Sequence, residues 1–170
     1  MIKLTIFEQT KTGYCGPAAL RMILDFYGFV ISEQALGRIC RTSVRAGTSP
    51  ENMINGINSL GWHGFWKENS GLADVKYFLK QERPVLIEWF SLYGESYEGH
   101  YSVIIGLDKQ YIYLADPEIG RVRKILVESF KKVWFDFEGP HLKHARRIYY
   151  EWMLVPSPDQ LAKNIKGHYF

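Results

Sequence analysis

The sequence predicts an α+β fold in which an N-terminal helical part packs on a C-terminal antiparallel sheet. The first half of the 170 residues shows apolar side chains at helical spacing, and the second half shows short apolar runs separated by turn residues. Helices followed by antiparallel strands are typical of the α+β class. The chain has the length of one domain and shows no repeat or linker, so we expect a single domain over residues 1–170.

The first half carries clear helix boundary signals. Pro17 suits the first turn of a helix, and Gly28 suits the position just beyond its end. Ser32 and Ser49 are typical N-terminal caps for two further helices. The predicted elements are a strand at 2–7, helices at 16–27, 33–40, 50–60 and 72–81, and a strand at 62–67.

The second half changes to the pattern of strands. Asp108 lies at the centre of a predicted hairpin, and Glu88 lies in a buried strand, where we expect it to meet an arginine. The predicted elements are a strand at 84–90, a polar loop at 91–99, hairpin strands at 100–107 and 111–116, a strand at 122–127, a short helix at 128–135 and a strand at 147–155. The tail after 157 is weakly patterned.

Composition and charge exclude several classes of protein. The net charge of +3 is too small to predict nucleic-acid binding, and no apolar run approaches the ~20 residues that span a membrane. Two cysteines allow at most one disulfide, and residues 1–7 lack a signal-peptide pattern. His141 and His144 are too loosely spaced for a zinc motif. We therefore expect a cytoplasmic protein without a metal or other cofactor, without nucleic-acid binding and without membrane insertion.

Cys15 lies at the predicted start of a helix, directly before Gly16 and Pro17. A thiol at this position faces the positive end of the helix dipole and unpaired backbone N–H groups, which favour the thiolate. Cys40 lies on an apolar helix end instead, and we expect it in the core. The sequence therefore indicates that Cys15 is a nucleophile.

His100 and Asp116 are the candidates for the groups that a cysteine nucleophile needs, a base and a residue that orients it. His100 opens an apolar strand and Asp116 closes the next one. If the turn near Asp108 has an odd number of residues, both side chains lie on one face of the hairpin, whereas an even number turns them to opposite faces. The turn length thus tests the pairing.

Several short motifs in their order along the chain resemble those of the double-glycine, bacteriocin-leader-processing cysteine peptidases, which are papain-like. They are Gln9 with Cys15-Gly-Pro-Ala-Ala-Leu20, Gly47-Thr-Ser49, Leu60-Gly61, Gly99-His-Tyr-Ser-Val103 and Ala115-Asp-Pro117. The similarity runs from about residue 5 to residue 127. It implies a papain-like fold with Cys15 as nucleophile, His100 as general base and acid, Asp116 as orienting residue and Gln9 as oxyanion donor.

The same resemblance implies a peptide or protein substrate, cut after Gly-Gly or another small-residue pair. Because this chain shows neither a membrane domain nor an ATPase domain, an ABC-type peptide exporter is expected only as a separate partner. Two other functions stay open. An acyltransferase or amidohydrolase would share the same thioester step, and a non-catalytic peptide-binding module would keep the groove without turnover.

Overall fold

The computed structural model describes residues 1–91, 98–138 and 142–170. The helices within these residues are α1 (Cys15–Phe26), α2 (Glu33–Ile39), α3 (Pro50–Ser59), α4 (Leu72–Leu79) and α5 (Val127–Val133), with a 3-10 turn over Leu142–His144. The strands are β1 (His63–Lys67), β2 (Val85–Ser91), β3 (Glu98–Leu107), β4 (Tyr111–Asp116), β5 (Arg121–Leu126), β6 (Phe135–Glu138), β7 (Arg147–Tyr150), β8 (Met153–Ser157) and β9 (His168–Tyr169).

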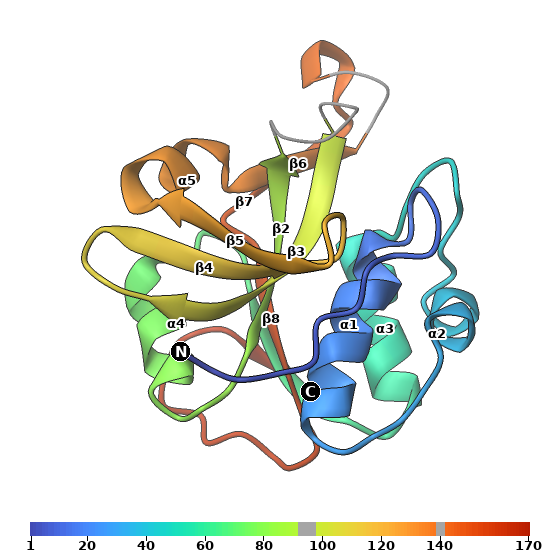
Figure 1. Cartoon of the computed structure of the whole chain (residues 1–170), viewed down its shortest axis with the longest axis horizontal. Coiled ribbons are helices and arrows are strands. Elements are labelled where there is room, and N and C mark those ends of the chain that lie inside the picture. Colours follow the sequence, from blue (N-terminus) through green and yellow to red (C-terminus); the bar gives the residue numbers. More distant parts are fainter. Residues whose placement is uncertain (92–97, 139–141) are drawn as a thin grey trace.

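Seven of these strands form one antiparallel sheet in the order β5-β4-β3-β2-β8-β1-β9, and β6 pairs with β7 in a second small sheet. Figure 1 shows α1, α2 and α3 gathered on one side of the molecule and α4 and α5 on the other. The predicted α+β class, with helices packed on an antiparallel sheet, is confirmed. No helix in the described ranges is long and apolar enough to cross a membrane.

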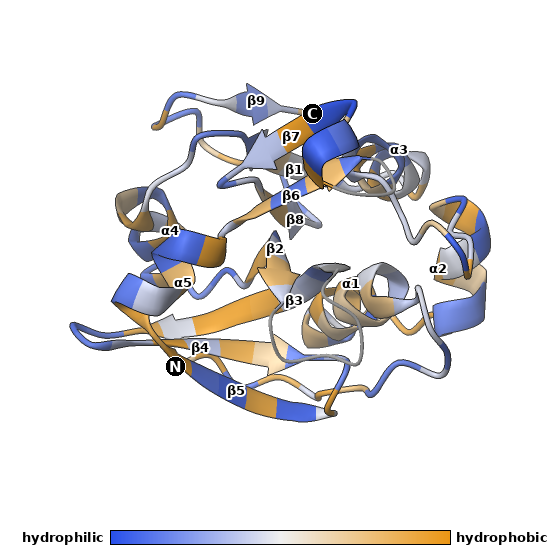
Figure 2. Ribbon diagram, turned by 90° about the horizontal axis from the view of Figure 1, so that it is seen from above, coloured by the Kyte–Doolittle hydropathy of each residue, from blue (hydrophilic) through white to orange (hydrophobic). Residues whose placement is uncertain are grey.

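Both faces of the main sheet are buried, because successive side chains of its central strands enter two different apolar clusters. On β2, Leu86 packs with the side of α1, and Ile87 packs with the side of α4 and α5. On β3, Val103 packs on the side of α1 and Ile104 packs on the side of α4 and α5. In Figure 2 the apolar helix α1 lies beside β3. β3 is therefore held from both sides, and it carries His100 near its start.

The predicted helix boundaries are largely confirmed. The hydroxyl of Ser32 accepts a hydrogen bond from the N–H of Ala35 at 3.2 Å, and Ser49 caps α3 in the same way through Asn52 at 3.3 Å. Gly28 follows α1 with a φ of 81°, a left-handed conformation that glycine adopts without strain.

The strand predicted at residues 2–7 is wrong, although its alternation is real. Ile2, Leu4 and Ile6 are partly buried against the α1 side of the core, but this segment is not part of a strand. Within the described residues one backbone hydrogen bond joins it to the sheet, from the N–H of Ile2 to the carbonyl oxygen of Ile105 at 2.7 Å. Burial of alternate side chains therefore produced a strand-like pattern without strand pairing.

The last predicted strand, 147–155, is also wrong, because the chain divides there into β7 and β8, which lie in different sheets. Glu151 separates them in a left-handed conformation with a φ of 47°. No glycine or proline marks this break in the sequence. The predicted polar loop at 91–99 is shorter than expected, because Ser91 belongs to β2 and Gly99 to β3. Residues 92–97 of that loop lie outside the described residues.

Leu20→Ala is expected to lower the free energy of unfolding by about 2–5 kcal/mol, because Leu20 is fully buried in α1 and its loss leaves a cavity. Urea denaturation followed by circular dichroism measures this change. Val30→Ala is the matched control, since Val30 is 87% exposed and should change stability by less than about 0.5 kcal/mol. Equal losses in the two variants would contradict the core assignment.

Candidate active site

Cys15 occupies the first position of α1 and is partly buried. Gly16 behind it allows close packing: a Cβ at this position would lie 2.8 Å from Met53 Cε, 3.2 Å from Thr48 Oγ1 and 3.3 Å from the ring of Tyr101. The first N–H groups of a helix have no acceptor within the helix, so this end of α1 offers donors and partial positive charge beside the thiol. The glycine thus lets the helix start lie directly on β3.

The turn between β3 and β4 has the parity that would separate His100 from Asp116. The N–H of Asp108 donates to the carbonyl oxygen of Tyr111 at 3.0 Å, so the two residues 109–110 form the turn. Asp108 Oδ1 also accepts hydrogen bonds from the N–H groups of Gln110 and Tyr111. An even turn by itself would place the two candidate side chains on opposite faces.

A β-bulge at Ile105 corrects this parity. The register of the hairpin shifts between Ile104 and Gly106, and beyond the shift Val103 lies opposite Ala115. Continuing this register places Asp116 diagonal to His100 on the same face. The prediction that both side chains share a face is confirmed, but the reason is the bulge and not an odd turn.

His100 and Asp116 form a buried hydrogen-bonded pair, in which Nε2 of the imidazole lies 2.8 Å from Oδ1 of the carboxylate. Because Asp116 occupies Nε2, Nδ1 is the ring nitrogen left for Cys15, with which the imidazole also forms a hydrogen bond. Burial alone would lower the pKa of His100. The hydrogen bonds and negative charges of Asp116 and Cys15 outweigh burial and raise this pKa to about 10. The site therefore favours an imidazolium at neutral pH.

Arg123 on β5 is a site residue that sequence reasoning missed. Its Nε lies 2.5 Å from Asp116 Oδ2, and its Nη2 lies 3.1 Å from Glu118 Oε2. The N–H of Glu118 donates to Asp116 Oδ1 at 2.9 Å. Burial alone would raise the pKa of Asp116, but the hydrogen bonds and positive charges of His100 and Arg123 lower it below its ordinary value. Asp116 is thus held as a carboxylate from two sides.

The register of β5 was the missing signal for this arginine. Arg121 lies directly opposite Asp116, whereas Arg123 lies opposite Leu114 and so is diagonal to the carboxylate. Both arginines share one face by alternation, and the sequence alone does not say which of them reaches Asp116. In the structure Arg123 makes the ion pair and Arg121 is exposed.

Gln9 lies close to the end of β4, because its N–H donates to the carbonyl oxygen of Pro117 at 2.7 Å. Its side-chain Nε2 donates to the carbonyl oxygen of Lys11 at 3.2 Å, and its buried Oε1 has no hydrogen-bond partner among the described residues. Within the same residues no hydrogen bond joins Gln9 to Cys15. The structure thus brings Cys15, His100 and Asp116 together and leaves the role of Gln9 as a prediction.

Two other predictions concern a metal and the second cysteine. His100, Asp116 and Glu118 place one ligand atom each within 4.8 Å of one another, but the guanidinium of Arg123 already contacts both carboxylates and disfavours a cation. His141 of the weak zinc motif lies outside the described residues.

Cys40 is fully buried, and burial raises the pKa of its thiol to about 12, so its core assignment is confirmed.

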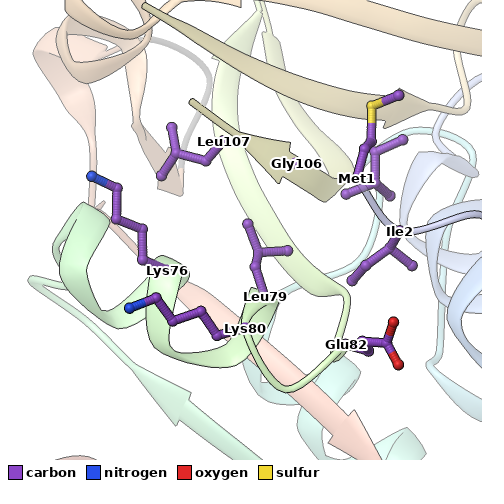
Figure 3. Close-up of a pocket in the computed structure, with 9 residues that line it drawn as sticks. Met1, Ile2, Lys76, Leu79, Lys80, Glu82, Gly106 and Leu107 are labelled. Atoms are coloured by element: carbon purple, nitrogen blue, oxygen red, sulfur yellow. The ribbon is translucent and has the colours of Figure 1, made fainter. Parts of the chain in front are cut away.

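A pocket of about 360 Å³ lies at the opposite end of β3 from His100. Figure 3 shows Met1, Leu79 and Leu107 around it, with Lys76 on α4 and Lys80 directly after the end of α4. Leu107 is seven residues from His100, a separation of ~20 Å along a strand. This pocket is therefore separate from the candidate site.

Comparisons with known proteins identify the family and the fold of this chain. The model of a family described as Peptidase_C39 like matches residues 1–140. A protein of unassigned function from Methanothermobacter thermautotrophicus is 32% identical over 129 residues, which cover 76% of this chain and 82% of the relative.

Two solved structures share the fold. The peptidase domain of Streptococcus ComA, a bifunctional ABC transporter involved in quorum sensing, has a TM-score of 0.69 at 20% identity and covers 94% of this chain and 100% of its own. A double-glycine-motif protease from an AMS/PCAT transporter, solved with its leader peptide, has a TM-score of 0.63 at 21% identity and covers 93% and 94%. The papain-like fold is therefore shown.

Proposed function

This chain belongs to the Peptidase_C39 like family, and we propose that it is a cysteine peptidase with Cys15 as nucleophile, His100 as base and acid, and Asp116 as orienting residue. The observation that carries the proposal is the continuous line of hydrogen bonds from Asp116 through His100 to Cys15. A nucleophile, a base and a group that orients the base are the parts that covalent acyl transfer needs.

The mechanism begins with the Cys15 thiolate beside the His100 imidazolium. The sulfur attacks the carbonyl carbon of the scissile peptide bond, and a tetrahedral oxyanion forms. His100 then gives its proton to the leaving amine, the C–N bond breaks and a thioester remains on Cys15. Water, deprotonated by His100, attacks the thioester, releases the carboxylic acid and restores the thiolate–imidazolium pair. Asp116 keeps the imidazole in one orientation throughout.

The oxyanion donors in this proposal are the backbone N–H of Cys15 and the side-chain amide of Gln9. Gln9 carries two hydrogens on Nε2, and the hydrogen bond to the carbonyl oxygen of Lys11 uses one of them. The second hydrogen remains to be directed at a substrate oxygen. The backbone bond to Pro117 holds Gln9 beside the end of the strand that carries Asp116.

The substrate we propose is a peptide cut after Gly-Gly or another pair of small residues. Support comes from the similar AMS/PCAT domain, which is named for the double-glycine motif and was solved with a leader peptide. That domain and ComA belong to transporters. We therefore extend the proposal to a separate ABC-type exporter as partner and to a cytoplasmic location.

We also propose that residues 1–170 work as one peptidase domain. The family match ends at residue 140, but the strands that follow it complete the two sheets. β8 pairs with β1 and β2, β9 pairs with β1, and β7 pairs with β6. The segment after residue 140 thus supplies two strands of the main sheet and one strand of the small sheet.

Mass spectrometry of the products from a peptide library, with and without an added amine acceptor, tests the reaction class. A peptidase releases two fragments, and the N-terminal fragment ends in a free carboxylic acid. An amide of the added amine as the main product would favour the acyltransferase alternative instead. Intact peptide that binds but is not cut would favour the binding module and contradict the proposal.

Iodoacetamide at pH 7 is expected to alkylate Cys15 and leave Cys40 unmodified in the folded protein. Cys15 is partly buried beside the imidazolium of His100, whereas Cys40 is fully buried with a pKa raised to about 12. Peptide mapping by mass spectrometry measures the modification at each cysteine. Denatured protein is the control, in which both cysteines should react, and faster labelling of Cys40 in the native state would contradict the assignment.

A further inference from the structure

Two carboxyl groups meet beside His100 in a place that the proposed mechanism does not use. Glu88 on β2 lies directly opposite Tyr101 of β3. Asp136 reaches the same place from β6, and its carboxylate lies against Gly99, where an added Cβ would come within 1.8 Å of Asp136 Oδ2. Glu88 therefore meets a second carboxyl group in place of the expected arginine. This pair adjoins Gly99, the residue that precedes His100.

The hydrogen bonds of this pair leave an acceptor without a donor. Glu88 is only 5% exposed, and its carboxyl group hydrogen-bonds to Asp136. The hydroxyl of Tyr101 has one proton to share between Glu88 and the carbonyl oxygen of Thr48, which it approaches at 3.1 Å. Glu88 Oε2 has no hydrogen-bond partner among the described residues. A buried acceptor of this kind is costly to leave unsatisfied.

Burial and the neighbouring carboxylate both act on the protonation of Glu88. Burial raises the pKa of Glu88 well above its ordinary value, and the nearby charge of Asp136 raises it further. Both effects favour the protonated form of Glu88, and the negative charge at this place is that of Asp136. The charge of Cys15 acts on Glu88 in the same direction, so the pair lies within electrostatic reach of the proposed nucleophile. No lysine or arginine in the described part of the chain forms an ion pair with Glu88.

We propose that Glu88 and Asp136 form an acidic subsite that binds a cationic group of the substrate, an ammonium or guanidinium, next to the bond that is cut. Such a group brings both a positive charge and several N–H donors, which match the negative charge and the unsatisfied acceptor at this place. The inference rests on the proposed function, because it takes the substrate to be the peptide held at Cys15. The subsite adds a preference for a positively charged group to the proposed preference for small residues at the cleavage site.

Charged thiol reagents test the subsite without requiring peptide cleavage. The rate of Cys15 modification is measured with a methanethiosulfonate that carries an ammonium group and with one of equal length that carries a hydroxyl. We expect the cationic reagent to react about tenfold faster with the native protein. The double variant Glu88→Gln/Asp136→Asn keeps the shape of the pair without its charge. In this variant we expect the cationic reagent to react only about one to three times as fast as the neutral reagent.

Glu128→Gln is the matched control, because Glu128 is an exposed residue of α5 and its replacement also removes one negative charge. Its reagent ratio is expected to equal that of the native protein. A native ratio near one, or an elevated ratio that survives in the double variant, would overturn the proposal. The pair would then serve only to join β6 to the main sheet.

Matched peptides identify which cationic group enters the subsite. One set compares lysine with norleucine at each position within two residues of the scissile bond, and a second set compares a free with an acetylated α-amine next to it. The native enzyme should cut one cationic peptide with a kcat/KM about tenfold higher than its neutral match, and the double variant should cut both equally. Equal values in every native pair would overturn the inference. If no peptide is cut at all, the proposed function fails while the reagent ratio still decides on the subsite.

Discussion

Cys15→Ala is expected to abolish turnover, with a fall in kcat of about five to six orders of magnitude, the scale observed when a covalent nucleophile is removed. Without the sulfur, the buried pair of His100 and Asp116 has no atom to activate and no thioester forms. Initial rates on the best peptide from the library measure the loss. Circular dichroism is expected to be unchanged, because Cys15 is partly buried at a helix start and the small methyl group of alanine fits there.

Cys40→Ala is the control for this result, since it makes the same chemical change in the core. Cys40 is fully buried, and its sulfur packs closely on Gly56, where an added Cβ would lie 2.5 Å away. We expect this variant to lose about 1–3 kcal/mol of stability but to keep kcat within a few-fold of the native value. Activity that survived in Cys15→Ala and vanished in Cys40→Ala would refute the assignment of the nucleophile.

Asp116→Asn is expected to lower kcat by about 10³–10⁴-fold, as in other sites where the residue that orients a catalytic histidine loses its charge. The asparagine has the same shape, but it no longer attracts the imidazolium. The pKa of His100 should therefore fall from about 10 toward the ordinary 6.5. NMR titration of the His100 ring measures this shift, and an unchanged pKa would contradict the role of Asp116.

The same variant makes a prediction about stability and pH. The pKa of His100 is raised by folding, so its stabilising contribution is complete below about pH 6.5 and is lost as the pH rises through about 10. The native protein should therefore exceed Asp116→Asn in free energy of unfolding by more at pH 6 than at pH 10. Urea denaturation at the two pH values measures the difference.

Arg123→Gln should give a smaller loss, about 10- to 100-fold in kcat, if the ~1.5–3 kcal/mol of a hydrogen bond to a charged group is removed. Arg121→Gln is the matched control on the same strand, because Arg121 lies opposite Asp116 in register but is exposed. We expect Arg121→Gln to keep native kcat. Equal effects from both variants would mean that net charge matters and the contact with Asp116 does not.

Elements with strong local signals were predictable from the sequence. The helix starts at Ser32 and Ser49 depend on caps only a few residues away, and the apolar run of β2 reflects burial on both faces. The break at Glu151 was not predictable, because it exists only since the segment before it joins the small sheet and the segment after it joins the main sheet. β6 was missed for a related reason, since its four half-buried residues pair only with a segment later in the chain.

The same distinction separates the residues of the candidate site that could be predicted from the sequence from those that could not. Cys15, His100 and Asp116 could be selected because each lies at the boundary of an element whose pattern is visible in the sequence. Arg123 and the pairing of Glu88 with Asp136 could not, because both depend on strand register and on contacts between elements. The match of Gln9 to the oxyanion role still rests on resemblance and on its position beside Pro117.

The bulge at Ile105 limits how this hairpin can change during evolution. The even turn and the single extra residue together keep His100 and Asp116 on one face. A one-residue insertion or deletion in either feature would rotate Asp116 toward α1 and separate it from the histidine. Length changes between these two residues are therefore tolerated only in steps of two or as compensated pairs. A relative whose hairpin differs from this one by an odd number of residues should have lost the bulge, moved it or lost the contact between the histidine and the aspartate.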